Sequence, residues 1–244
     1  MLVAVTVLIF SAVKLIGYFG ESYAAERVTD TMIQSGVGIP GESPVTDGTD
    51  GHQVPIVPLD VDFEMLCAQY PDLIGWLYCP ETPINYPIMY SGDNDYYLRR
   101  LPDGTYNENG SLFLDYQNET DFSSPHSIIY GHNMKNDAML GSLENYQKQA
   151  YYEEHPVIYL LTPEADYEIR LLGAYTADPD SDSYCMPEDT DGIADLVSMA
   201  VANSFFTSSD RPTGEEPVIT LSTCTYNRDN DRFVVVGYLY QISE

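Results

Sequence analysis

The segment Thr220–Val236, TLSTCTYNRDNDRFVVV, constrains the fold of this chain more than any other. An apolar, β-branched run ends at Cys224, an Asn- and Asp-rich stretch follows, and a second β-branched run begins at Arg232. Two such runs around a turn-forming cluster predict a β-hairpin. If the loop is centred near Arg228, Cys224 and Arg232 face each other across the two strands, with Cβ atoms about 5 Å apart. The predicted hairpin therefore sets a thiol beside a fixed guanidinium.

The place of Cys224 in its strand favours a reactive thiol, although a cysteine in a strand is most often a small buried hydrophobe. Strand alternation puts Thr220 and Ser222 on the same face as Cys224, and that face becomes polar toward the thiol. Ile219 and Leu221 lie on the opposite face and are the expected core residues. We therefore expect Cys224 to be unpaired and to act as a nucleophile.

A second chemical locus is SIIYGHNM, residues 127–134. A short β-prone run precedes Gly131, which ends the strand and places His132 just beyond the strand end. A histidine at such a junction can titrate near neutrality and reach a neighbouring thiol. A single histidine in a loop more often makes a structural hydrogen bond than it takes part in catalysis. His126 and His155 lack this context, and we expect both to be structural or exposed.

Together the two segments resemble the active-site motifs of the sortases, the membrane-anchored cysteine transpeptidases of Gram-positive bacteria. TLSTC, with Arg eight residues later and RFVVVGYL after it, is similar to the class B active-site hairpin, and YGHNM followed by GSL is similar to the class B catalytic-histidine segment. The resemblance covers residues 60–240. It implies a mainly β fold with helices (α+β). The expected core is a closed β-barrel of about eight strands, with an N-terminal helix and an inserted helix before the last strand pair.

The resemblance implies a cysteine transpeptidase that needs neither metal nor cofactor. Cys224 attacks the Thr carbonyl of a C-terminal sorting signal (LPxTG- or NPxTx-like), and His132 protonates the leaving amine. Arg232 holds the oxyanion or the substrate backbone by charge-assisted hydrogen bonds, and it is favoured over Arg228, which lies in mid-loop with no strand to fix it. Class B members often carry Glu after the cysteine, whereas this chain has Thr225. The expected substrate-binding residues are Ser222, Thr223, Tyr130, Asn94 and Leu98.

The implied partners are surface proteins that carry a sorting signal and the stem-peptide amine of a peptidoglycan precursor. Within the family, the alternative is a pilus-polymerising enzyme that uses a pilin lysine as its amine. A different class of protein, a non-catalytic surface-binding β domain with a merely buried cysteine, is a further alternative. An L,D-transpeptidase-like enzyme would need a Ser-His-Gly-Cys block, which this sequence lacks.

The charge balance excludes nucleic acid as a partner. The chain holds 10 Lys plus Arg against 38 Asp plus Glu, a net charge of −28, so a polyanion would find no basic footprint. The spacing of the four cysteines matches no zinc pattern. We expect Cys67 and Cys79 to be packing residues and Cys185 to lie exposed in a polar loop.

Three regions are expected along the chain. Residues 1–19 are almost wholly apolar, with Lys14 as the only charge, and a helix of this length reaches about 27 Å. They are expected to form a single membrane anchor with the catalytic domain outside the cell. A signal peptide cleaved after Ser22-Tyr23-Ala24 is the other interpretation. Residues 20–58 are expected to be a flexible linker, and residues 59–244 the catalytic domain.

Helical spacing predicts two helices within that domain. One is capped by Asp60 and ends before Pro71, and the other spans residues 192–206. We expect the second helix to wall one side of the groove that leads to Cys224. A further helix is expected around Met139 and Leu143, and a hairpin over residues 155–177. The sequence contains no internal repeat.

Overall fold

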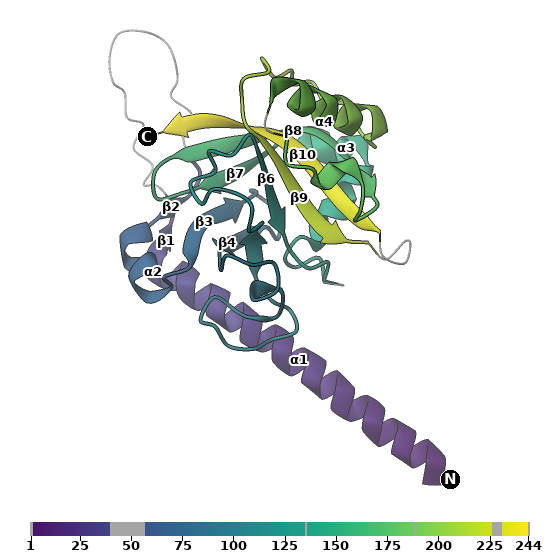
Figure 1. The fold of residues 1–244 in the computed structure, drawn as a ribbon. Helices are drawn as coiled ribbons and strands as arrows, with labels where there is room; N and C mark the ends of the chain where they lie inside the picture. The colour runs from purple at the N-terminus through teal and green to yellow at the C-terminus, as the bar shows by residue number, and fades with distance from the viewer. Residues whose placement is uncertain (1, 40–56, 135, 188, 226–230, 244) are drawn as a thin grey trace.

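The computed structural model describes residues 2–39, 57–134, 136–187, 189–225 and 231–243, and its centre is a closed barrel of eight strands (Figure 1). Around the barrel the order is β10-β8-β7-β3-β4-β5-β6-β9, with β9 paired to β10. The pairs β4–β5 and β6–β9 are parallel and the others antiparallel. The fold class predicted from the sequence is confirmed. The strands are β3 (Leu73–Tyr78), β4 (Asn85–Met89), β5 (Leu112–Leu114), β6 (His126–Tyr130), β7 (Val157–Leu161), β8 (Asp166–Ala177), β9 (Val218–Cys224) and β10 (Arg232–Ser243).

Alternation along the last two strands divides the core into an inner and an outer part. Ile219 and Leu221 of β9 are fully buried in one cluster with Phe233 of β10, as predicted. The opposite face is covered too, because Val218 packs in a second cluster with residues of the helix α4 (Thr190–Asn203). The strand is thus buried on both faces until its last residue, Cys224, which is exposed.

The helices begin and end at side-chain caps that the sequence indicated only in part. Helix α2 (Phe63–Gln69) is capped by Asp62, whose side chain accepts from the Met65 N–H at 2.9 Å. Asp60, the predicted cap, lies instead in the short strand β2 (Asp60–Val61). The helix expected around Leu143 is a 3₁₀ helix, η2 (Gly141–Gln147). The remaining elements are η1 (Tyr97–Arg99), α3 (Gln149–Glu154) and η3 (Asp182–Tyr184).

The prediction of a flexible linker from residue 20 is wrong for residues 20–38. Helix α1 (Leu2–Gly36) continues through them, and β1 (Val37–Gly38) pairs with β2 (Figure 1). Met32 is 0% exposed, and Val28 and Ile33 pack in the same cluster, so the helix has an apolar face that the barrel buries. The Gly- and Pro-rich stretch that suggested a linker lies further along. Residues 40–56, including His52, and the hairpin residues 226–230, including Arg228, lie outside the described residues.

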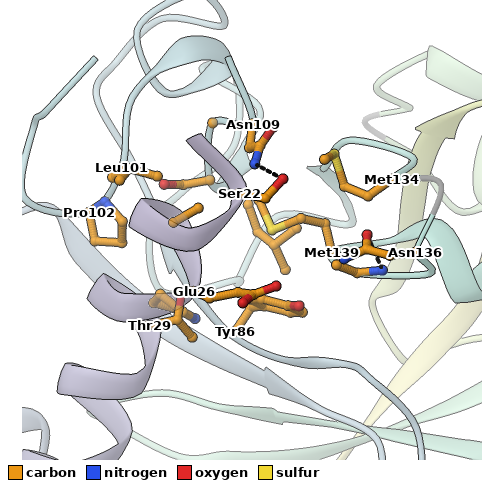
Figure 2. Close-up of a pocket in the computed structure, with 16 residues that line it drawn as sticks. Ser22, Glu26, Thr29, Tyr86, Leu101, Pro102, Asn109, Met134, Asn136 and Met139 are labelled. Carbon is orange, nitrogen blue, oxygen red and sulfur yellow. Dashed lines mark hydrogen bonds between the residues drawn. The ribbon is translucent and has the colours of Figure 1, made fainter. Parts of the chain in front are cut away.

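The second half of α1 is also held by polar contacts to a loop of the barrel. Asn107 Nδ2 donates to the Glu21 carbonyl at 2.9 Å, and Asn109 Nδ2 lies 3.4 Å from Ser22 Oγ (Figure 2). The cavity between this helix and the barrel measures about 40 Å³. Figure 1 shows the first half of α1 projecting away from the barrel. Among the described residues, no helix combines the length and the hydropathy that crossing a membrane requires.

His126 makes the stability of the fold depend on pH. Its ring is 1% exposed, with Nδ1 at 2.8 Å from the Cys185 carbonyl and Nε2 at 2.8 Å from Thr220 Oγ1. Burial lowers the pKa of His126 below its usual value of 6.5, although the Cys185 carbonyl and Asp115 act in the opposite direction. The unfolded chain therefore binds a proton below about pH 6.5 that the folded protein does not bind.

We expect the free energy of unfolding to fall as the pH drops below about 6.5, with a contribution from His126 of at most about 1.4 kcal/mol per pH unit. Urea unfolding of the wild type and His126→Gln at pH 7.5 and pH 5 measures that contribution. The stability difference between the two proteins should narrow at the lower pH. His155→Gln is the matched control, and its difference from the wild type should not follow this pattern. If the difference in free energy of unfolding between the wild type and His126→Gln stayed constant with pH, His126 would not be the source of the pH dependence.

Candidate active site

A groove of about 250 Å³ opens where β6 and β9 end and β10 begins. The structure brings together in it all the residues that the sequence indicated for catalysis or substrate binding. Phe113 and Gly131 complete its lining. The predicted residues that line the groove are Asn94, Leu98, Tyr130, His132, Ser222, Thr223, Cys224 and Arg232.

The strand register explains why Cys224, His132 and Arg232 lie on neighbouring segments of the backbone. Strands β6 and β9 are parallel with Tyr130 opposite Ser222, and the Gly131 N–H donates to the Ser222 carbonyl at 3.1 Å. His132 and Cys224 each lie two residues beyond that pair. On the other side of β9, Arg232 pairs directly with Cys224, as the hairpin pattern predicted. Three neighbouring segments, about 4.8 Å apart, therefore carry the three groups.

Cys224 is exposed and unpaired at the end of β9. Its carbonyl accepts from Asn133 Nδ2 at 2.7 Å, and the same amide group donates to Glu144 Oε1 at 2.9 Å. This bridge ties the loop that carries His132 to the strand end that carries the thiol. The other three cysteines are free as well; Cys79 is buried and Cys185 exposed, as expected.

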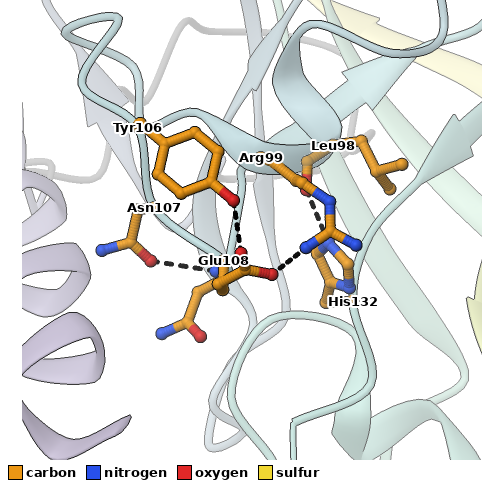
Figure 3. A network of polar contacts seen from close by, with 7 residues as sticks. Leu98, Arg99, Tyr106, Asn107, Glu108 and His132 are labelled. Carbon is orange, nitrogen blue, oxygen red and sulfur yellow. Dashed lines mark hydrogen bonds and ion pairs between the residues drawn. The ribbon is translucent and has the colours of Figure 1, made fainter. Parts of the chain in front are cut away.

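The imidazole of His132 is oriented by a backbone carbonyl. Its Nε2 lies 2.8 Å from the carbonyl oxygen of Leu98 in η1 (Figure 3). A carbonyl only accepts, so Nε2 carries the proton of the neutral ring and Nδ1 is left as the proton acceptor. The next residue, Arg99, forms an ion pair with Glu108, which also accepts from the Tyr106 hydroxyl. These contacts brace the segment that holds the Leu98 carbonyl.

A buried carboxylate, which was not predicted from the sequence, lies behind the groove. Asp115 Oδ2 accepts from Asn94 Nδ2 at 2.8 Å and from the Tyr130 hydroxyl at 2.9 Å. Asp115 follows β5 and is 3% exposed. Burial raises the pKa of Tyr130 far above its usual value, and the negative charge of Asp115 adds to the effect, so the phenol stays protonated. The one available signal was an acidic residue at the end of an apolar strand.

The inserted helix does not form the groove wall that we expected, and a residue of the segment before it instead contacts two residues that line the groove. Tyr184 of η3 lies with its hydroxyl 2.8 Å from Ser222 Oγ, and its ring stacks on Tyr130 at 6.4 Å with an interplanar angle of 9°. Burial raises the pKa of Tyr184 to about 12, although Ser222 and Arg232 act in the opposite direction. Helix α4 packs on β8 and contributes no residue to the groove lining. Tyr184 was missed because it lies in an acidic stretch without strand or helix periodicity.

The groove chemistry is that of nucleophilic acyl transfer. An exposed thiol can attack a carbonyl, an imidazole in the same groove can move a proton, and a guanidinium can hold negative charge on oxygen. Within the part of the chain that the structure describes, no three His, Cys, Asp or Glu side chains are grouped so that they could hold a metal ion.

Known proteins match this chain over most of its length. The sequence model of the family "Sortase domain" matches residues 77–240. Sortase B of Listeria monocytogenes is 35% identical over 174 residues, which is 69% of this chain and 70% of the relative. Sortase B of Staphylococcus aureus is 29% identical over 196 residues, 79% of each chain. The solved structure of a Staphylococcus aureus sortase B–substrate complex shares the fold. Its TM-score is 0.74 at 24% identity, over 93% of this chain and 100% of that one.

Proposed function

Because this chain belongs to the sortase family and its curated relatives are sortase B enzymes, it is a cell-wall sorting transpeptidase, and we propose that Cys224, His132 and Arg232 carry its chemistry. The observation that supports this assignment most is the register of β6, β9 and β10, which places the three residues on neighbouring segments that line one groove. The substrate is a surface protein with an LPxTG- or NPxTx-like sorting signal, cleaved after its Thr.

The first half of the reaction forms a thioester. The thiol of Cys224 passes its proton to Nδ1 of His132, and the resulting thiolate attacks the Thr carbonyl. The guanidinium of Arg232 stabilises the negative charge that develops on the carbonyl oxygen. The C–N bond then breaks, and the leaving amine takes a proton from His132. The C-terminal part of the sorting signal departs, and the rest of the surface protein stays bound to the sulfur.

The second half of the reaction passes the acyl group to an amine. His132 removes a proton from the incoming amine, whose nitrogen attacks the thioester carbonyl. An amide forms, and the thiolate of Cys224 leaves and is ready for the next cycle. The acceptor that we propose is the stem-peptide amine of a peptidoglycan precursor. A pilin lysine is the alternative acceptor, and it requires the same proton transfers.

Substrate binding is proposed for the remaining residues of the groove. The half-exposed side chain of Leu98 and the ring of Tyr130 offer apolar surface to the signal, while the amide of Asn94 offers hydrogen bonds. Ser222 and Thr223 precede the nucleophile on β9 and border the position of the scissile bond.

We further propose that residues 1–19 anchor the enzyme in the cell membrane and that the domain from residue 59 onward lies outside the cell. Members of this family are associated with the cell surface. The apolar run with Lys14 as its only charge supports an anchor. Protease treatment of intact cells should digest the catalytic domain and leave an N-terminal fragment in the membrane fraction. A full-length protein recovered from the soluble fraction would contradict the anchor.

Incubation of the protein with LPxTG-, NPxTx- and SPxTG-like peptides, with and without candidate amines, tests the function. We expect cleavage after Thr, and in the presence of a suitable amine a ligated product detected by mass spectrometry. A stem-peptide mimic and a pilin-derived lysine peptide distinguish the two acceptors. If the protein binds the peptides but cleaves none of them, it is a binding domain rather than a transpeptidase.

Arg232→Ala is expected to lower kcat/KM by about 10²- to 10³-fold, because the oxyanion loses its charged donor. Arg232→Lys should recover only part of the activity, since an ammonium is a point charge without the planar fork of the guanidinium. Peptide cleavage kinetics measure both effects. Arg170→Lys, on β8 outside the groove, should change kcat/KM little. Near wild-type cleavage by Arg232→Ala would remove this residue from the mechanism.

A further inference from the structure

We propose that Asp115 is a positioning residue that sets the hydrogen-bonding direction of the groove floor, so that Asn94 donates to the backbone of a bound peptide and Tyr130 accepts from it. This inference rests on the proposed function, because it concerns the groove in which the sorting signal is expected to bind. The ligand that such a floor recognises is an extended peptide backbone rather than a particular side chain.

The carboxylate of Asp115 is fixed before any substrate arrives. Its own N–H donates to the Ile128 carbonyl at 2.9 Å, and its carbonyl accepts from the Asn118 N–H at 3.0 Å. Its Oδ1 accepts from the Gln117 N–H at 2.9 Å. Only Oδ2 is directed toward the groove residues, and both Asn94 and Tyr130 donate to it. A buried carboxylate held in this way acts as a rigid acceptor.

The contacts of Asn94 determine which way round its amide lies. Its Oδ1 accepts from the Tyr116 N–H at 3.0 Å, and one Nδ2 hydrogen goes to Asp115 at 2.8 Å. A flipped amide would set its oxygen against the carboxylate and its NH₂ against an N–H donor. The orientation is therefore fixed, and the second Nδ2 hydrogen serves neither contact. Because Asn94 lines the groove, that hydrogen is a donor for a peptide carbonyl.

Tyr130 offers the groove a hydrogen-bond acceptor, whereas Asn94 offers it a donor. Its hydroxyl donates to Asp115, so the phenolic oxygen offers only lone pairs to the groove. The ring is confined by Phe113, at a centroid distance of 5.4 Å, and by Tyr184, stacked at 6.4 Å. A fixed donor and a fixed acceptor that share one carboxylate match the carbonyl and N–H groups along an extended peptide.

Asp115→Asn tests the inference with a side chain of the same shape. The amide has one oxygen where the carboxylate had two, so its NH₂ group must face either Gln117 N–H or the pair Asn94 and Tyr130, and no charged acceptor enforces the orientation of that pair any longer. We expect KM for a cleaved peptide to rise about tenfold with kcat within about threefold of the wild type, since the effect lies in binding. Tyr130→Phe should raise KM to a similar extent, and the double variant no more than either single variant.

Asp210→Asn is the matched control. It alters a carboxylate that also lies against a tyrosine hydroxyl, that of Tyr238, at 3.4 Å and outside the groove. Its KM should equal that of the wild type. Peptides N-methylated at one position at a time provide a test that needs no change at Asp115. Methylation at one peptide position should weaken binding to the wild type but not to Tyr130→Phe. The methyl group removes the N–H that donates a hydrogen bond to the phenolic oxygen of Tyr130.

The outcomes separate this inference from the proposed function. A wild type that cleaves no peptide contradicts the function. A wild type that cleaves, with an Asp115→Asn variant of unchanged KM, overturns the role of Asp115 alone. The role of Asp115 is also overturned if the increases in KM caused by Asp115→Asn and Tyr130→Phe multiply in the double variant. The two residues would then act separately. Alkylation of Cys224 by iodoacetamide should proceed at the wild-type rate in Asp115→Asn. If that variant does not fold, the N-methyl scan decides.

Discussion

Cys224→Ala is expected to abolish peptide cleavage and amine ligation, with kcat/KM falling to the uncatalysed background. The proposed reaction passes through a covalent thioester, and alanine offers no atom to form it. The groove, the register of β9 with β10 and the position of His132 do not depend on the sulfur, so the variant should still bind the peptide. Cleavage kinetics and fluorescence binding with the same labelled peptide measure the two properties separately.

Cys185→Ser is the matched control for this prediction, because Cys185 is also an exposed free cysteine but does not line the groove. Its turnover should stay at the wild-type level, and alkylation of the wild type with iodoacetamide should remove activity through Cys224 alone. If Cys224→Ala retained turnover, or if Cys185→Ser lost it, the nucleophile would have been assigned to the wrong thiol.

His132→Gln is expected to lower kcat for a peptide substrate by about 10²- to 10⁴-fold, the range for loss of a general acid–base group. The variant keeps an N–H donor for the Leu98 carbonyl but has no group that can exchange a proton with the amine. An ester analogue of the signal has a leaving group that needs less protonation. The variant should therefore cleave the ester much closer to the wild-type rate than it cleaves the amide.

The comparison of amide with ester separates a catalytic role of His132 from a structural one. His155→Gln is the control, since His155 contacts Tyr151 outside the groove and should leave both rates unchanged. An equal loss on amide and ester substrates would mean that the substitution disturbs the groove itself. Unchanged amide cleavage would exclude His132 as the proton donor.

The catalytic hairpin could be predicted because its signals are local. The β-branched runs on either side of an Asn- and Asp-rich turn determine the register that pairs Cys224 with Arg232. The strand break at Gly131 likewise indicated where His132 would lie. These features follow from a few consecutive residues, which makes them readable without knowledge of the remaining fold.

Features that depend on distant contacts could not be read in this way. Asp115 and Tyr184 belong to the site only because the barrel brings the end of β5 and the segment η3 against Tyr130. The linker prediction failed for a similar reason. The face of α1 that carries Met32 becomes a packing face only when α2 and the barrel lie beside it. No residue spacing near these positions indicates the partner.

Mass spectrometry of the wild-type protein, acid-quenched while it turns over a sorting-signal peptide without an added amine, shows directly whether Cys224 carries the acyl group. We expect a protein whose mass has increased by the acyl fragment ending in Thr. After digestion, the modification should map to Cys224, and it should disappear on addition of hydroxylamine or of the acceptor amine. Turnover without any adduct at Cys224, or an adduct on another residue, would contradict the claim that β6, β9 and β10 assemble the active site around this thiol.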